Sequence, residues 1–188
     1  MMEGALTGKT GFTGEAGYCY VGAVRQGDRT LIVALLACGW PNNKNYKWAD
    51  TKTLVQYGLD QYGYCNYWED AMQDQDIRIL EAGKKRTVKD APAKDGNLYQ
   101  DGTVNTFLNI DDQDREKRIL MKKTEAIQVQ IEEKQEITAP IESGDILGTV
   151  TILLNGETLD EKPIVSGESI QKKNLLWIYR QLWKSYAL

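Results

Sequence analysis

Two apolar runs near the start of the chain predict paired β-strands. Residues 18–25 and 30–38 are rich in aromatic, β-branched and aliphatic side chains, and Gln26-Gly27-Asp28-Arg29 between them has the composition of a turn. Together with the segment around Lys9, these runs predict three consecutive antiparallel strands. The run 30–38 is apolar at nearly every position, which predicts that both of its faces are covered.

A helix is predicted from about Lys44 to Tyr62, after a break rich in Gly, Pro and Asn. Its apolar residues recur at helical spacing and form one stripe, made of Trp48, Val55, Leu59 and Tyr62. This stripe predicts that the helix covers one face of the preceding sheet. No other predicted element of this region covers the opposite face.

From about residue 77 the pattern changes to short alternating strands with many charges and with turn signals such as Asp101-Gly102. Apolar and polar residues alternate through 127–132, which predicts a strand with one buried face. Residues 148–154 and 157–165 flank Asn155-Gly156, a strong hairpin signal. Several short strands of this kind predict a small β-sandwich or barrel, and we take the all-β sandwich as the prediction.

These patterns predict an α+β chain with four parts. Residues 1–66 hold a partial antiparallel sheet with its helix, and residues 67–76 form a linker. Residues 77–168 form the β-sandwich domain, and residues 169–188 form an amphipathic tail helix. At 188 residues the chain is long enough to bury a core in one or two domains.

The tail has an apolar stripe on one helical face, at positions 175, 178, 179, 182, 183 and 186. Its Trp and Tyr residues lie beside Lys and Arg, a composition suited to the headgroup zone of a membrane. At about 1.5 Å per residue the tail is too short to cross a bilayer. We expect four aromatic residues to face a membrane surface: Trp177, Tyr179, Trp183 and Tyr186. The alternative is a helix docked on the protein itself.

Charge and composition exclude several function classes. The chain carries 23 basic and 27 acidic residues without a basic face, so no nucleic-acid partner is expected. It contains no histidine, which excludes a Ser-His-Asp triad, a histidine general base and histidine-containing zinc sites. We expect no metal and no cofactor, and a hydrolytic site would need a lysine or carboxylate base.

The three cysteines match no metal-binding spacing, and a disulfide framework is the less favoured interpretation. Cys19 and Cys38 lie in apolar strands, where a free thiol usually serves as a small buried apolar group. Cys65 lies in an aromatic loop and is the one that we expect to be exposed.

Lys9-Thr10-Gly11 places a cation, a hydroxyl and a residue without a side chain in the first predicted strand. Such a tripeptide suits a strand that lines a groove, because a ligand backbone can approach Gly11 closely. The alternative is an ordinary strand that contains a glycine. With Ala16-Gly17-Tyr18 and the Trp48-bearing helix that follow, this element resembles the end of the peptidase domain of D-alanyl-D-alanine carboxypeptidases, the low-molecular-mass penicillin-binding proteins. The region after about Ile77 resembles their C-terminal β domain.

The resemblance implies a serine-type hydrolase of peptidoglycan, which removes the terminal D-alanine of a muropeptide and is acylated by β-lactams. The substrate would lie antiparallel to the Lys-Thr-Gly strand. Lys9 would give electrostatic support near the nucleophile, Thr10 would hold the terminal carboxylate, and the N–H of Phe12 would form half of the oxyanion hole. The resemblance also implies the extracytoplasmic face of the cell envelope, and a membrane surface as partner of the tail.

The family places its Ser-x-x-Lys and Ser-x-Asn motifs upstream of Lys-Thr-Gly, and eight residues precede Lys9 here. We therefore expect the C-terminal portion of such an enzyme, inactive by itself. Its uncovered sheet face would drive self-association or accept a complementing N-terminal half. Ser169-Ile170-Gln171-Lys172 and Tyr64-Cys65-Asn66 imitate the missing motifs on the wrong side of Lys9, and we interpret them as a coincidence and a loop.

The first residues have neither the basic region nor the apolar core of a signal peptide, so the chain as given would stay in the cytoplasm. A second hypothesis from another class is a non-catalytic, membrane-proximal binding or assembly module. The sequence does not decide between these hypotheses, and it leaves open the oligomeric state, the ligand of the β domain and the preferred peptide stem.

Overall fold

Antiparallel strands and short helices alternate along residues 3–186, the part of the chain that the computed structural model describes. They form two units. The first unit comprises Met1–Tyr64 and Leu120–Thr124, and the second comprises Cys65–Ile119 and Glu125–Leu188. Both units combine strands with helices, which confirms the predicted α+β class.

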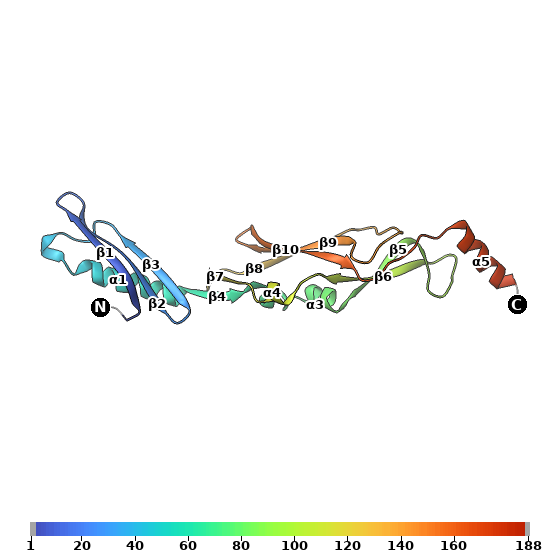
Figure 1. Cartoon of the computed structure of the whole chain (residues 1–188), viewed down its shortest axis with the longest axis horizontal. Coiled ribbons are helices and arrows are strands. Elements are labelled where there is room, and N and C mark those ends of the chain that lie inside the picture. The colour runs from blue at the N-terminus through green and yellow to red at the C-terminus, as the bar shows by residue number, and fades with distance from the viewer. Residues whose placement is uncertain (1–2, 187–188) are drawn as a thin grey trace. The chain divides into compact units, whose positions relative to one another are not determined.

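The first unit is a three-stranded antiparallel sheet with a helix packed on one face (Figure 1). Strands β1 (Ala5–Thr13), β2 (Gly17–Gln26) and β3 (Arg29–Leu35) lie side by side in chain order. The short helix η1 (Pro41–Asn43) precedes α1 (Tyr46–Gln61). The predicted strands and helix are therefore confirmed, with boundaries shifted by a few residues.

Helix α1 packs on the sheet through a stripe displaced from the predicted one. Its buried residues are Lys47, Thr51, Val55 and Gly58. Val55 forms the core of the unit with Val24 and Val33, whereas Trp48 is 50% exposed and contacts the sheet through the ring of Tyr20. Thr51 and Gly58 let the helix approach closely, because a Cβ at position 58 would lie 3.0 Å from Cδ1 of Leu31.

The opposite face of the sheet is exposed. In β3 the side chains of Leu31 and Val33 pack toward α1, while Ile32 between them is 75% exposed. Val21 of β2 is 46% exposed, and it lies in register with Ala34. The apolar pattern of the run 30–38 predicted cover on both faces, but α1 covers one face only. The opposite face is bare, as we expected for this chain unless another element packs there.

The second unit is built around one five-stranded antiparallel sheet in the order β5-β6-β10-β9-β8. Its strands are β5 (Lys84–Pro92), β6 (Asp101–Leu108), β8 (Ile127–Glu133), β9 (Ile146–Leu154) and β10 (Glu157–Ser166). Strands β4 (Tyr62–Asn66) and β7 (Arg118–Lys122) form a separate two-stranded sheet.

The five-stranded sheet curls into a half-barrel instead of the predicted two-sheet sandwich. The chain that follows β8 meets β5 from the other edge of the sheet: Lys89 N–H donates to the carbonyl of Ile137 at 2.8 Å, and Ala139 N–H donates to the carbonyl of Lys89 at 3.0 Å. Lys84 of β5 also forms an ion pair of 2.8 Å with Glu133 of β8. These bonds join the two edges, so a second sheet is not needed to cover the interior.

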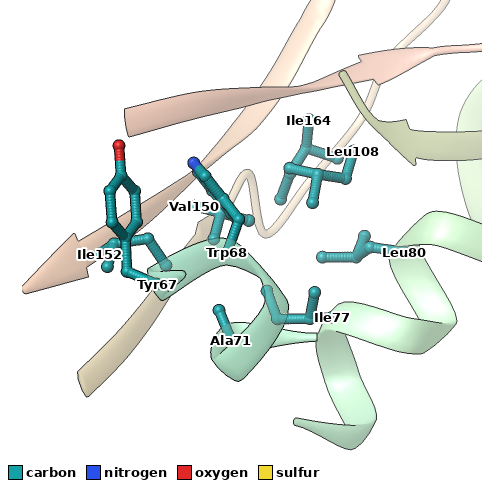
Figure 2. Close-up of a cluster of buried hydrophobic side chains, with 9 residues drawn as sticks. All are labelled: Tyr67, Trp68, Ala71, Ile77, Leu80, Leu108, Val150, Ile152 and Ile164. Atoms are coloured by element: carbon teal, nitrogen blue, oxygen red, sulfur yellow. The ribbon is translucent and has the colours of Figure 1, made fainter. Parts of the chain in front are cut away.

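Helices α2 (Tyr67–Ala71) and α3 (Gln75–Ala82) pack against the sheet and complete its larger core. Figure 2 shows this core, made of Tyr67, Trp68, Ala71, Ile77, Leu80, Leu108, Val150, Ile152 and Ile164. The segment 67–76, which we predicted as a linker, instead carries α2 and the start of α3. It places the fully buried ring of Trp68 in this core.

Local turn chemistry was predicted well. Asn155 and Gly156 have positive φ angles of 54° and 82° and connect β9 to β10, as expected of an Asn-Gly hairpin. The alternation through 127–132 is confirmed, because half-buried and exposed residues alternate along β8. Asp101 and Gly102, predicted as a turn, instead begin β6.

Two further helices complete the second unit, α4 (Asp112–Arg115) and α5 (Leu175–Tyr186). Helix α5 confirms the predicted C-terminal helix over residues 175–186. Residues 169–174, predicted as its start, are not helical, and positions 187 and 188 lie outside the described residues. None of its residues is buried. Among residues 3–186, no helix has the length and apolar character that a membrane span requires.

Candidate functional site

The Lys-Thr-Gly motif lies on an edge strand. Strand β1 pairs with β2 along one side, and among the described residues no strand pairs with its other side. In the register of this pair, Lys9, Thr10, Gly11 and Phe12 stand opposite Val21, Tyr20, Cys19 and Tyr18. All nine residues of β1 are exposed. The predicted site residues therefore lie together on an accessible strand.

Backbone hydrogen bonds show which groups of β1 face the open edge. Tyr18 donates its N–H to the carbonyl of Gly39 and accepts the N–H of Cys38, both at 2.7 Å. Both groups of Tyr18 thus point away from β1, so Phe12 and Tyr18 form a non-hydrogen-bonded pair. The N–H and C=O of Phe12 consequently point to the open edge. By the same alternation, so do those of Thr10.

Side chains of the motif divide between the two faces of the sheet, because successive strand residues point to opposite faces. Lys9 and Gly11 share the exposed face with their β2 partners Val21 and Cys19. A Cβ placed at Gly11 would meet no atom within 4 Å. The fold itself therefore gives no packing reason for a glycine at position 11.

Gly8, on the same strand, is different. It shares the α1 face with Tyr20, and a Cβ at Gly8 would lie 2.5 Å from the hydroxyl oxygen of that ring. A Cβ at Gly22 would lie 2.1 Å from the same oxygen. Gly8 and Gly22 thus make room for Tyr20, which in turn contacts Trp48 with ring centroids 5.1 Å apart. One glycine of β1 serves packing, and the other leaves open space.

An aromatic column supports the end of the motif. The ring of Phe12 lies 4.6 Å from that of Tyr18, and the Nζ of Lys47 lies 4.4 Å from the centroid of the Tyr18 ring. Such cation–π and ring contacts hold a strand end against the helix beside it. The turn after β1 is fixed as well, because Trp40 Nε1 donates to the carbonyl of Gly14 at 3.2 Å.

The two segments that resemble the Ser-x-x-Lys and Ser-x-Asn motifs, at residues 169–172 and 64–66, do not form a second site. Ser169 Oγ accepts the N–H of Ser143 at 3.0 Å, and Lys172 forms an ion pair of 3.3 Å with Asp90. Ile170 between them is bridged to Ile141, so the segment is extended and not helical. Residues 64–66, interpreted as a loop, lie in β4, and Asn66 caps α2 by accepting the N–H of Glu69.

The cysteines differ in environment. Cys38 is buried, and its thiol donates to the carbonyl of Tyr18 at 3.0 Å. Cys19 is half-buried. Cys65, expected to be exposed, is also half-buried, and its thiol donates to Asp70 Oδ2 at 2.9 Å. Burial, with the hydrogen bond and charge of Asp70, raises the pKa of Cys65 to about 12.

All three cysteines are free. Within residues 3–186 there is no cluster of three or more cysteine and carboxylate side chains placed to hold a metal ion.

A polar network in the second unit was not anticipated from the sequence. Asp160 of β10 accepts hydrogen bonds from the hydroxyl of Tyr67 at 3.2 Å and from Trp68 Nε1 at 3.1 Å, and it forms an ion pair of 3.2 Å with Lys117. Burial acts to raise the pKa of Asp160, but the hydrogen bonds from Trp68 and Lys117 outweigh it and lower that pKa.

Asp114 extends this network. It binds Lys117 at 2.6 Å and also Lys162. The hydrogen bonds from Lys117 and Lys162 lower the pKa of Asp114 to about 2. Asp160 and Asp114 lie too far in sequence from most of their partners for a local pattern to pair them. The sequence offered one signal, because Asp160 is a lone aspartate in the middle of a predicted strand.

The tail residues predicted to face a membrane divide into two groups. Tyr179, Trp183 and Tyr186 are 63%, 67% and 85% exposed, and the rings of Tyr179 and Trp183 stack with centroids 6.5 Å apart. Trp177 is half-buried. It lines a surface hollow of about 450 Å³ together with Tyr179 and Trp183 of the first group, and the two groups differ in exposure.

This chain is similar to several known proteins. Residues 113–172, from α4 to the segment before α5, match the family described as penicillin-binding protein 5, C-terminal domain. The D-alanyl-D-alanine carboxypeptidase DacF of Bacillus subtilis (strain 168) is 25% identical over 168 residues, which are 89% of this chain. The chain is related to the D-alanyl-D-alanine carboxypeptidases. This confirms the predicted resemblance. The chain spans 38% of the length of DacF.

Solved structures with similar names also match this chain, at lower sequence identity than DacF. Penicillin binding protein 5 from Haemophilus influenzae is 20% identical with a TM-score of 0.36, over 87% of this chain and 42% of that one. The D-alanyl-D-alanine carboxypeptidase DacD from Francisella tularensis is 21% identical with a TM-score of 0.40, over 88% and 36%. The peptidoglycan synthesis regulatory factor PBP3 from Streptococcus pneumoniae is 17% identical with a TM-score of 0.35, over 87% and 42%.

Proposed function

We propose that this chain supplies the substrate-lining strand and the C-terminal domain of a D-alanyl-D-alanine carboxypeptidase that acts on peptidoglycan. One observation carries the proposal. The edge strand β1 presents Lys9-Thr10-Gly11 on an open edge, in a chain related to enzymes of this name. The space beside Gly11 is empty, as a strand that receives a ligand backbone requires.

The geometry of β1 supports a distinct role for each residue. A peptide that ends in D-Ala-D-Ala would add to the open edge by backbone pairing with Thr10 and Phe12. The cation of Lys9 would stabilise negative charge near the reacting carbonyl, and the hydroxyl of Thr10 would bind the terminal carboxylate. The N–H of Phe12 points to the same edge, where it would donate to the oxyanion. A β-lactam would occupy this edge in the same way.

The nucleophile has to come from residues outside the given sequence. Its first serine is Ser143, so no Ser-x-x-Lys or Ser-x-Asn precedes Lys9. Acyl transfer fails at its first step without an activated nucleophile. We therefore expect that the 188 residues alone form no covalent adduct with a fluorescent penicillin. Labelling of the chain alone would contradict this part of the proposal.

The decisive experiment supplies the missing part. The part of DacF that precedes the region matched by this chain would be fused to this chain, and labelling by fluorescent penicillin would be measured. We expect the fusion to be labelled, and Lys9→Met or Thr10→Val to slow labelling at least about tenfold. Thr7→Val, which changes an exposed threonine of the same strand, is the matched control and should leave the rate unchanged. Equal rates in all variants would overturn the proposal.

We also propose that the chain works at the extracytoplasmic face of the cell envelope, with α5 lying on the membrane surface. The support is the large exposed apolar side chains of α5, among them Leu175 at 86% and Trp183 at 67%. Flotation with lipid vesicles tests this. Binding of the chain should be weakened by Trp183→Ser and Leu182→Ser, because these remove apolar area from the exposed stripe.

The exposed sheet face favours a second candidate function, a non-catalytic binding or assembly module. Ile32 and Leu36 are 75% and 82% exposed, and apolar surface of this kind promotes association. Static light scattering over a range of concentrations tests whether this face drives association. A mass that rises with concentration, and falls back to that of the single chain in Ile32→Thr, would support the module.

A further inference from the structure

We propose that the loop of residues 93–100, between β5 and β6, is a second lipid-binding element that contacts a membrane surface together with α5. This inference rests on the proposed membrane role of α5 and adds a separate contact to it. The partner is the headgroup zone of a bilayer that contains anionic lipid. Tyr99 is the residue of the loop that makes the contact.

The charges of α5 fit this partner. Residues 172–186 contain Lys172, Lys173, Arg180 and Lys184 and no acidic residue, within a chain of net charge −4. Lys172 and Lys173 are paired with Asp90 and Asp101 at 3.3 and 3.6 Å. Neither Arg180 nor Lys184 forms an ion pair with another described residue, so their charges remain available to anionic headgroups.

Contacts on both sides fix the loop of residues 93–100 beside α5. Lys173 Nζ donates to the carbonyl of Gln100 at 2.7 Å, which anchors the end of the loop just before α5 begins. Gly96 of the loop lies against α5 further along the helix, at Gln181: a Cβ placed on Gly96 would be 3.0 Å from Gln181 Oε1. Loop and helix lie at the same end of the second unit (Figure 1). A surface that receives α5 therefore lies within reach of this loop.

Tyr99 is held out from the protein. Its side chain is 96% exposed, the highest value among the exposed large apolar residues described. Its backbone is ordered all the same: Tyr99 N–H donates to Asn97 Oδ1 at 2.9 Å, and Asn97 N–H donates to Asp95 Oδ1 at 3.0 Å. These side-chain turns specify the loop conformation and leave the ring without a packing partner.

A tyrosine in this position suits a bilayer surface. Its ring is apolar and its hydroxyl is polar, the combination that places Tyr and Trp at membrane interfaces. Tyr46 offers a comparison, because it is also largely exposed, at 54%, but lies on α1 of the first unit. If exposure of any tyrosine were sufficient for lipid contact, the two residues would behave alike.

The test measures partitioning of the full chain into vesicles of equal parts phosphatidylglycerol and phosphatidylcholine, by flotation. We expect Tyr99→Ser to lower the partition coefficient about threefold or more, because an interfacial ring is lost. Tyr99→Trp should bind at least as well as the unaltered chain, and the control Tyr46→Ser should not differ from it. Since the Tyr99 ring has no packing partner, the serine variant should unfold at the same denaturant concentration.

The outcomes separate this inference from the proposed role of α5. If Trp183→Ser weakens binding while Tyr99→Ser binds like the unaltered chain, the role of α5 stands and the loop contact is overturned. If Tyr99→Ser and Tyr46→Ser weaken binding equally, the contact is not specific to the loop and the inference is also overturned. If the unaltered chain does not float with the vesicles, both proposals fail.

Discussion

The sheets of the two units are covered to different extents. In the second unit the sheet curls, and α2 and α3 pack on it. Its edge strand β5 is joined to β8 by the ion pair between Lys84 and Glu133, and to the chain after β8 by backbone hydrogen bonds. In the first unit the core is small, one face of the sheet is exposed, and the outer edge of β1 is open. The unit that is least covered is the one that carries Lys-Thr-Gly. An open edge leaves backbone groups unpaired, which lowers stability. A strand that binds a peptide by backbone pairing has to keep such an edge open.

The largest difference between the units should appear in their tryptophans. Trp68 is fully buried, whereas Trp48 is 50% exposed. Trp68→Ala should destabilise the second unit by about 4 kcal/mol, because it leaves a large cavity and an unmatched Asp160. Trp48→Ala should cost the first unit about 1 kcal/mol or less. Denaturant unfolding, followed by signals from each unit, measures both values. Equal losses would contradict the comparison.

A smaller loss is expected when the polar network is broken. Asp160→Ala should cost about 2 kcal/mol, since the buried donors of Tyr67 and Trp68 lose their acceptor. Asp160→Asn keeps an acceptor oxygen and should cost less than the alanine variant. Urea unfolding of the two variants gives both numbers. If asparagine proves as damaging as alanine, the ion pair with Lys117, and not the hydrogen bonds, is the main contribution.

Two glycines of β1 sharpen the comparison within the first unit. Gly8→Ala should destabilise it by about 1 kcal/mol, because the new Cβ would displace Tyr20. Gly11→Ala should be neutral or stabilising by about 0.5 kcal/mol, since the added Cβ meets no atom and the unfolded chain loses freedom. Thermal unfolding of both variants provides the measurement. A destabilised Gly11→Ala would mean that packing, not a ligand, requires this glycine.

The smallest expected effect is the contribution of Asp114 to stability, which is present at neutral pH and is lost in acid. Its pKa is lowered from 3.8 to about 2 by hydrogen bonds from Lys117 and Lys162. A carboxyl whose pKa is lower in the folded state stabilises the fold above its unfolded pKa, and this contribution is lost as pH falls through the folded pKa.

Stability of the second unit should therefore decrease between about pH 4 and pH 2. Unfolding measured across this range should show a weaker pH dependence in Asp114→Asn than in the matched variant Asp112→Asn, which alters a neighbouring residue of α4. Identical slopes in the two variants would exclude Asp114 as the origin of the acid sensitivity.

Local signals predicted the local structure. The strands of the first unit, α1 and the Asn155-Gly156 hairpin follow from turn residues and apolar runs that lie within a few positions of each other. The Lys-Thr-Gly strand was predicted for the same reason. Which edge the N–H of Phe12 faces could not be predicted, because that depends on the bonds of Tyr18 to Cys38 and Gly39.

The predictions that failed depend on distant partners. Residues 67–76 resembled a linker because the core that buries Trp68 is supplied mainly by β9 and β10, far along the chain. The sandwich was predicted because short strands give no sign of which edges meet, and here Lys89 meets Ile137 and Ala139. The stripe of α1 was displaced because Thr51 and Gly58 are buried for their small size, which an apolar pattern does not register.

The bond between Trp68 and Asp160 joins residues 92 positions apart, and this has a consequence for biosynthesis. At roughly 5–20 residues per second, the ribosome needs about 5–20 seconds after making Trp68 before its acceptor exists. During that interval the indole and the apolar side of α3 have no sheet to enter. Strands β1 to β3 and helix α1, which are complete by Gln61, can meanwhile assemble. Nascent chains should accordingly gain protection from protease in two steps, the later one only after β10 has left the exit tunnel.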